Sequence, residues 1–227
     1  MKHFATILLL LLGACQGPEL SVRPGINDPF LGAEVDVDDF AMKWEGESRE
    51  VYVNRAAIVD AMNLEPGSTV ADVGAGTGAF LEELARAVGP SGRVLALDIA
   101  PEFVARLAER AEREDLPQVE ARLCSERSLD LPRNSIDVAF ACDVYHHFEY
   151  PRSSVGSIAR ALRPGGEFIL VDFERIPGVS RPWILDHVRA GKEQVFGELE
   201  SFGFTLVEEI ELPGLVENWM ARFRLEP

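Results

Sequence analysis

Short apolar segments alternate with helical patterns along the middle of the chain. The apolar segments, which predict strands, cover residues 69–73, 94–99, 119–123, 136–142 and 167–173. The helical patterns between them cover residues 79–88, 101–113 and 153–162. Strands that are apolar on both faces and alternate with helices are typical of a parallel sheet covered on both sides. This feature excludes all-helical and all-β folds.

The C-terminal part adds a helix and two strands to this pattern. A helix is expected over residues 183–202, followed by strands over residues 205–210 and 219–225. In the last strand apolar and charged residues alternate, as in a half-exposed antiparallel strand. We therefore predict an α/β fold with a mostly parallel seven-stranded sheet, helices on both faces and a C-terminal antiparallel strand.

Composition limits the size of the fold and its partners. With 227 residues, of which 47% are hydrophobic, the chain can bury one sizeable core. The net charge of 22 − 38 = −16 argues against a nucleic-acid partner, because no basic patch offsets it. Cysteines stand at positions 15, 124 and 142, a spacing that matches neither a disulfide framework nor a zinc pattern. Cys124 and Cys142 are expected to be packed thiols.

The first residues have the layout of a signal peptide. Lys2 precedes an apolar run over residues 4–12, which is too short to span a membrane and ends in small residues before Cys15. This end resembles the lipobox of bacterial lipoproteins, in which the cysteine is acylated after cleavage. The alternatives are a misassigned start codon and a buried N-terminal helix.

These observations predict the domain organisation. Residues 1–14 would be a signal peptide, residues 15–37 a tether rich in proline and glycine, and residues 38–227 the folded domain. Helical stretches in residues 38–63 would form a lid or collar that carries Trp44 and Tyr52, which would either close over a ligand or pack in the core. If the signal is used, the protein is attached to the membrane through acylated Cys15 and faces the periplasm; otherwise it is cytoplasmic.

Glycines follow the first predicted strand. Gly74, Gly76 and Gly78 lie between that strand and the next helix, where glycine permits a tight turn and a close approach of the backbone to a ligand. Asp98 ends the second strand, and a carboxylate in that place can accept both hydroxyls of a ribose. Together the turn and the acid indicate a nucleoside-binding site.

The residue before the turn bears on which nucleoside binds. Asp72 would disfavour a pyrophosphate beside the glycines but suits a ligand that carries an ammonium group. A nucleotide-dependent oxidoreductase, which the spacing of Gly74, Gly76 and Ala79 formally permits, is therefore ranked last.

Four segments in order resemble the class I S-adenosylmethionine-dependent methyltransferases. They are residues 72–78, 96–99, 135–140 and 161–166, and the resemblance extends from about residue 49 to the C-terminus. It implies a Rossmann-like fold, S-adenosyl-L-methionine as the cofactor, and Asp98 and Ile99 at its ribose and adenine. Many relatives have Gly-Asp after the third strand, whereas this chain has Ser125 and Glu126, either of which could contact the adenine. The cofactor-binding residues that the resemblance implies are Asp72, Gly74, Ala75, Gly76, Thr77, Gly78, Asp98, Ile99, Ser125, Glu126 and Asp143.

Residues 143–148 follow the fourth strand, where open α/β sheets bind ligands. They resemble a methyltransferase subgroup with an Asp-x-Tyr-His-His signature, which implies catalytic roles for Tyr145, His146 and His147. A histidine could act as general base on the acceptor; alternatively, one caps the turn and the other packs. We predict no metal site, because adjacent histidines seldom point the same way, although His187 and Asp172 could converge with them.

Two readings of the activity remain. In the first, the protein methylates a small-molecule or lipid-like acceptor. In the second, it is a catalytically silent binding module at the cell envelope. The choice between them depends on the compartment. S-adenosylmethionine is made in the cytoplasm, whereas a lipobox directs export away from it. The sequence predicts no oligomeric state.

Overall fold

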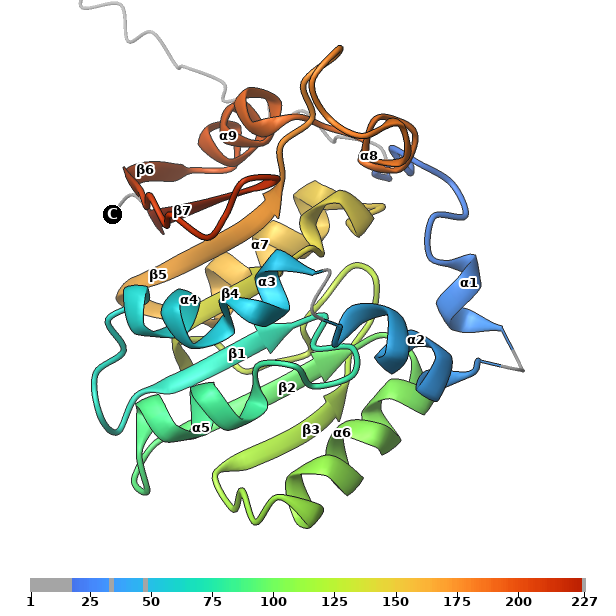
Figure 1. The fold of residues 1–227 in the computed structure, drawn as a ribbon. Helices are drawn as coiled ribbons and strands as arrows, with labels where there is room; N and C mark the ends of the chain where they lie inside the picture. Colours follow the sequence, from blue (N-terminus) through green and yellow to red (C-terminus); the bar gives the residue numbers. More distant parts are fainter. Residues whose placement is uncertain (1–17, 33–34, 47–48, 226–227) are drawn as a thin grey trace, which may run out of the picture.

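The computed structural model describes residues 18–32, 35–46 and 49–225, and its centre is one mixed β-sheet (Figure 1). Within these residues the sheet has seven strands in the order β3-β2-β1-β4-β5-β7-β6. Their bounds are β1 Thr69–Val73, β2 Arg93–Asp98, β3 Val119–Leu123, β4 Ile136–Cys142, β5 Leu162–Phe173, β6 Phe204–Glu209 and β7 Asn218–Leu225.

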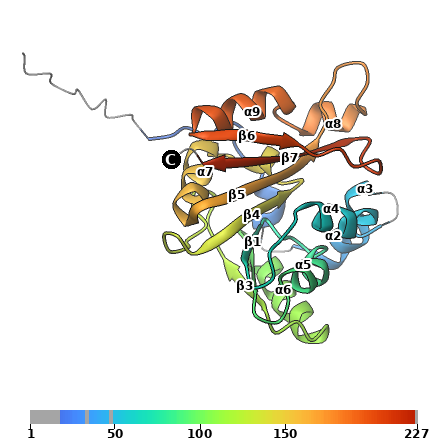
Figure 2. The same cartoon turned by 90° about the vertical axis from the view of Figure 1, so that its left-hand side faces the viewer.

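The direction of the strands confirms the predicted fold class. β1 pairs in parallel with β2 and β4, and β3 and β5 extend the parallel part at its two edges. β7 is antiparallel to both β5 and β6. Figure 2 shows β5, β7 and β6 together on one side of the molecule, with β3 on the other.

Helices cover both faces of the sheet because successive residues of a strand point to opposite sides. Val70 of β1 packs among side chains of α4 (Arg55–Ala61), α5 (Leu81–Val88) and α6 (Pro101–Arg113). The next residue, Ala71, belongs to the core beneath α7 (Pro151–Ala161) and α9 (Lys192–Ser201). Both residues are fully buried, so two dry cores hold the sheet in place.

The region after β5 differs from the prediction. The expected single helix over residues 183–202 is wrong: α8 (Pro182–His187) and α9 are separate helices. Val188 and Gly191 have extended backbone conformations, and Gly191 is the N-cap of α9. Val188 packs with Phe173 and Ile184, whereas Val195 and Leu199 of α9 belong to another core. The apolar residues at helical spacing in this segment therefore do not share one helix face.

The described part of the N-terminal segment, which was expected to be a tether, contacts the domain. Residues 18–32 include α1 (Asp28–Leu31), and α2 (Val37–Trp44) and α3 (Glu50–Val53) follow. The Glu19 carboxylate accepts the backbone N–H groups of Arg152 and Ser153, both at 2.8 Å, and so caps the N-terminus of α7. The Val22 N–H donates to the Glu149 carbonyl at 3.0 Å. In the part of the chain that the structure describes, no helix is long and apolar enough to cross a membrane.

Candidate functional site

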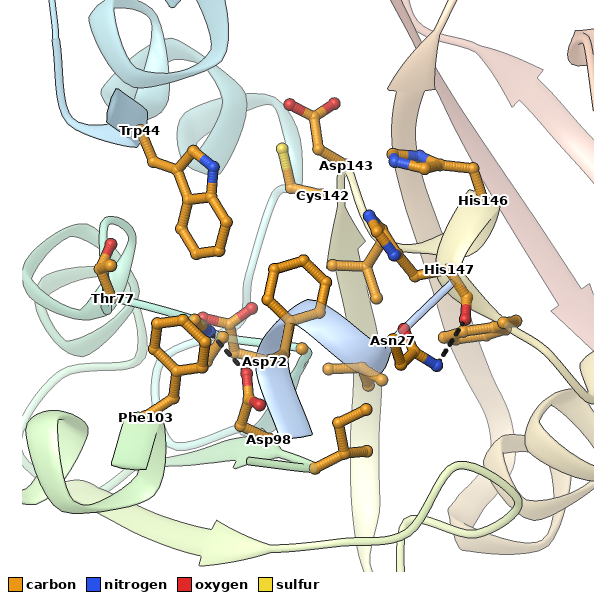
Figure 3. A pocket seen from close by; sticks show the side chains of 18 of the residues that line it. Asn27, Trp44, Asp72, Thr77, Asp98, Phe103, Cys142, Asp143, His146 and His147 are labelled. Carbon is orange, nitrogen blue, oxygen red and sulfur yellow. Dashed lines mark hydrogen bonds between the residues drawn. The ribbon is translucent and has the colours of Figure 1, made fainter. Parts of the chain in front are cut away.

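A cavity of about 450 Å³ opens at the carboxyl ends of β1, β2 and β4 (Figure 3). β1 and β4 are neighbours in the sheet. The strand that follows β1 in the chain, β2, lies on one side of this pair, and the strand that follows β4, β5, lies on the other side. Such a switch point is where open α/β sheets bind ligands. The site predicted from the sequence therefore lies where the topology places a pocket.

The glycine turn forms one wall of this cavity. Gly74 and Gly76 have φ angles of +70° and +52°, which favour glycine. A Cβ on Gly74 would lie 2.6 Å from Val144, and one on Gly76 would lie 3.1 Å from the Trp44 ring. Ala75 and Thr77 also line the cavity. Gly78 does not: its hydrogen faces Leu81 and Leu107, so its lack of a side chain serves helix packing.

Asp98 connects β2 to the glycine turn. One oxygen of its carboxylate accepts the Gly76 N–H and the other accepts the Ala100 N–H, both at 2.9 Å. Burial raises its pKa, and the backbone hydrogen bonds oppose that shift. Each carboxylate oxygen has a second lone pair, so the fixed Asp98 can also accept ligand hydroxyls.

Asp72 supports the expectation of a cationic ligand. Its side chain is 3% exposed and lines the cavity, and no hydrogen bond to its carboxylate occurs among the described residues. Burial, and then repulsion by Asp98, raises the pKa of Asp72 to about 7. A buried carboxylate without a protein partner is costly unless a ligand donor or cation compensates it. The amino group of S-adenosylmethionine fits this requirement, and its ribose fits Asp98.

The adenine end includes a residue that sequence reasoning missed. Ile99, Ser125 and Glu126, which the resemblance to methyltransferases places at the adenine, line the cavity. Asn27 joins them: its amide donates to the Glu126 carboxylate at 2.8 Å and to the His147 carbonyl at 3.2 Å. Asn27 was assigned to the tether, and no local pattern indicates that it would fold back about a hundred residues along the chain.

Aromatic residues from the N-terminal helices cover the cavity. Phe30, Phe40 and Trp44 pack against one another and against Phe103 of α6, with ring centroids between 4.7 and 6.3 Å apart. Tyr52 also lines the cavity. Of the lid expected over residues 38–63, the part with Phe40, Trp44 and Tyr52 lines the cavity, whereas α4 packs in the core.

Asp143 follows β4, lines the cavity and has a left-handed backbone conformation, with φ +55°. Its carboxylate accepts from Arg49 at 2.6 Å and from the Asn218 amide at 2.5 Å. Burial raises the pKa of Asp143 to about 6, with Arg49 opposing the shift. These contacts tie α3 and β7 to the end of β4, so Asp143 shapes the site as well as lining it.

His146 is fixed by a buried carboxylate. Its Nδ1 lies 2.7 Å from Oδ1 of Asp172 in β5, and its backbone N–H donates to Oδ2 at 3.1 Å. Both side chains are 3% exposed. A carboxylate only accepts, so Nδ1 carries the hydrogen of this contact, and in the neutral ring Nε2 has a lone pair that can bind a metal ion.

His147 and His187 complete a group of three imidazoles beside the cavity. Their Nε2 atoms are 3.2 Å apart, and the centroids of the adjacent rings His146 and His147 are only 4.4 Å apart. The adjacent histidines therefore do lie together, contrary to the reason given for expecting no metal. Burial lowers the pKa of His147 to about 2 and that of His187 to about 4, so both rings are neutral at pH 7.

Tyr145 belongs to the core and not to the site. Its fully buried ring does not line the cavity, and its hydroxyl donates to Glu198 at 2.9 Å. Arg189 forms an ion pair with the same carboxylate at 2.8 Å. The signature alone could not show this, because α9 lies about fifty residues further along the chain.

The two described cysteines have no nucleophilic character. Burial raises the pKa of Cys124 to about 12 and that of Cys142 well above its usual range. Thiols with such pKa values stay protonated and pack as small apolar groups. Cys15 lies outside the described residues.

Comparison with known proteins agrees with this geometry. Residues 71–170 match the family model of a methyltransferase domain. The chain is 30% identical over 137 residues to an arsenite methyltransferase of Halobacterium salinarum. The aligned segment covers 60% of this chain and 34% of that protein. It is 34% identical over 134 residues to nocamycin O-methyltransferase of Saccharothrix syringae. Here the aligned segment covers 59% of this chain and 48% of that protein.

The fold is found in a solved structure as well. The crystal structure of a SAM-dependent methyltransferase from Aquifex aeolicus superposes with a TM-score of 0.74 at 23% identity, over 84% of this chain and 98% of that one. The chain spans only a third to a half of the length of the curated relatives it matches. Residues 71–170 thus match a methyltransferase domain, and the chain shares its fold with the S-adenosylmethionine-dependent methyltransferase from Aquifex aeolicus.

Proposed function

We propose that the protein transfers a methyl group from S-adenosylmethionine to a small-molecule acceptor. The observation that carries this proposal is one cavity with two chemically different ends. Asp72 and Asp98 supply buried carboxylates at one end, and three imidazoles lie at the other, of which those of His147 and His187 are neutral at pH 7. When bound, the cofactor supplies an activated methyl group on a sulfonium.

The residues at the cofactor end bind and orient. Asp98, held by two backbone N–H groups, would accept the ribose hydroxyls, and Asp72 would pair with the amino group. The aromatic lid over the glycine turn would exclude water from the reacting atoms. Methyl transfer gains chiefly from such positioning.

The imidazoles mark the acceptor end. Phe148, Phe173 and Trp183 line the cavity near them, a surface suited to an aromatic or lipid-like acceptor. The similarity to an O-methyltransferase supports an acceptor with a nucleophilic hydroxyl. An imidazole nitrogen can accept the hydrogen of such a hydroxyl. This contact holds the acceptor in place and makes its oxygen more reactive.

Cofactor binding tests the proposal directly. The full chain, titrated calorimetrically, is expected to bind both S-adenosylhomocysteine and S-adenosylmethionine with micromolar affinity. NAD serves as the control, because the glycine turn next to Asp72 should reject a pyrophosphate. A folded chain that binds neither sulfur compound would refute the proposed activity and favour a silent binding module.

The raised pKa of Asp72 predicts a pH dependence of binding. Below pH 7 the carboxyl becomes protonated and loses its attraction for the ligand's ammonium group, so affinity for S-adenosylhomocysteine should fall by up to about tenfold per pH unit. In the ligand-free chain the same raised pKa costs stability as the pH rises toward 7, since the unfolded chain releases this proton at lower pH. Asp72→Asn should flatten the binding profile, and an unchanged slope in this variant would contradict the assignment.

We further propose that the chain is a lipoprotein anchored through Cys15. The support is the order of Lys2, the apolar run and the small residues before Cys15. Wild-type protein expressed in a bacterium should fractionate with membranes, and Cys15→Ala should not. Cys124→Ser is the matched control. The proposal fails if the Cys15→Ala protein fractionates like wild type and retains its N-terminus by mass spectrometry.

A further inference from the structure

Three of the chain's four histidines meet at the acceptor end of the cavity. His146 and His147 lie in the short 3-10 helix η1 (Tyr145–His147), and His187 ends α8. One ring nitrogen from each of the three lies within 4.8 Å of those of the other two. The ring of His187 is 5.1 Å from that of His146 and 5.0 Å from that of His147, between centroids.

The spacing of the nitrogens suits a metal ion. Nitrogen ligands at about 2.0–2.1 Å from a tetrahedral zinc ion lie about 3.4 Å from one another. The Nε2 atoms of His147 and His187 are already 3.2 Å apart. Two neutral imidazoles share at most one hydrogen at such a contact, whereas a cation would use the lone pairs of both.

Asp172 provides the second feature of a metal centre. Metal-binding histidines almost always donate their other ring N–H to a carboxylate or carbonyl, which fixes the tautomer and orients the ring. The Nδ1–Oδ1 contact of 2.7 Å between His146 and Asp172 is of this kind. The Phe173 N–H and the His146 N–H also donate to Asp172, so its carboxylate is held rigidly.

Neighbouring residues hold the three histidines in place, and one side of the histidine cluster faces the cavity. Arg23 donates to the carbonyls of His187, at 2.5 Å, and Asp186, at 2.7 Å, and so fixes the end of α8. Nδ1 of His147 is buried without a partner among the described residues. All three histidines line the cavity, so a cation bound by them would keep a coordination position directed at the pocket.

We propose that His146, His147 and His187 bind a divalent transition-metal ion of the Zn²⁺ type, with Asp172 as the positioning residue of His146. That this ion holds the oxygen of a hydroxyl-bearing acceptor rests on the proposed methyltransferase function. The binding of the ion itself does not. A hydroxyl on such an ion loses its proton more readily, which would prepare it for methylation.

Cobalt binding tests the site. The full chain, without an affinity tag and stripped of metal, is titrated with Co²⁺ alone while the visible absorption is recorded. One equivalent should develop the spectrum of a low-coordinate cobalt centre with nitrogen ligands, and Zn²⁺ should abolish it. His147→Ala and His187→Ala should each lose the spectrum. His3→Ala, which alters the remaining histidine of the sequence, should keep it.

Further variants separate metal binding from folding. Asp172→Asn should weaken Co²⁺ binding by about 10–100-fold, as expected for a partner of a ligating histidine. Asp186→Asn, next to His187, and Cys124→Ser should leave the spectrum unchanged. Circular dichroism checks that each variant is folded, and His187 on the outer helix α8 is the replacement with the least effect on the core.

The outcomes are distinct. Absence of stoichiometric Co²⁺ binding, or equal binding by folded His147→Ala and His187→Ala, would overturn the metal site. Titration of the same samples with S-adenosylhomocysteine reports separately on the proposed function. A chain that binds S-adenosylhomocysteine but not Co²⁺ refutes only the metal site, and the reverse result refutes only the methyltransferase assignment.

Discussion

Replacing Asp98 with alanine is expected to weaken the binding of S-adenosylhomocysteine by about 100-fold or more. The carboxylate would contribute hydrogen bonds to both ribose hydroxyls, each worth about 1.5–3 kcal/mol when the acceptor is charged. It also accepts the Gly76 N–H, so its loss frees the glycine turn that faces the ligand. Calorimetric titration of the full-length variant measures the change.

Two comparisons make this result specific. Glu109→Gln removes an exposed carboxylate from α6 and should leave the affinity unchanged. Asp98→Asn keeps the side-chain shape and one acceptor oxygen, so its affinity should fall between those of the alanine variant and the wild type. Unchanged affinity in a folded Asp98→Ala protein would undo the assignment of this end of the cavity to the cofactor.

Replacing His146 with alanine is expected to have a large effect of a different kind. Methyl transfer should fall by about 100-fold or more, the range typical of losing a proton-transfer group or a metal ligand. The affinity for S-adenosylhomocysteine should change by no more than about threefold, because His146 lies at the end of the cavity proposed for the acceptor. A panel of phenols, quinols and thiols is first screened for a compound that the wild type methylates. Transfer of a radiolabelled methyl group to that compound then measures the turnover of the variant.

A second substitution guards against a purely structural effect. In His146→Asn the side-chain amide can still donate to Asp172, while the second ring nitrogen is gone. This variant should be as inactive as His146→Ala but closer to wild type in thermal stability. Full turnover in His146→Asn would show that the outer ring nitrogen has no part in the reaction.

Local sequence patterns were sufficient for the elements that contain the core. The bounds of β1, β3, β4 and α6 agree with those expected. β1 and β4 are mostly apolar, and α6 begins at Pro101, a residue favoured in the first turn of a helix. The helix expected over residues 183–202 failed because residues that share a helical stripe can pack into different cores.

The site was predictable only where the topology of the sheet fixes the position of a residue. Asp72 and Asp98 stand at strand ends, whose place in a parallel sheet is fixed by topology. The contacts of Asn27 with Glu126 and of Tyr145 with Glu198 join residues far apart in sequence. No periodicity reports such contacts, and this is why Asn27 was missed and a core tyrosine was placed in the site.

The capping of α7 by Glu19 limits how far an anchored form of this protein could stand from a bilayer. Only residues 16–18 separate Cys15 from Glu19, and an extended chain spans at most about 3.6 Å per residue, or roughly 14 Å in total. A lipid on Cys15 would thus keep the domain within about one headgroup layer of the surface. Acceptors dissolved in the membrane would then reach the enzyme by lateral diffusion.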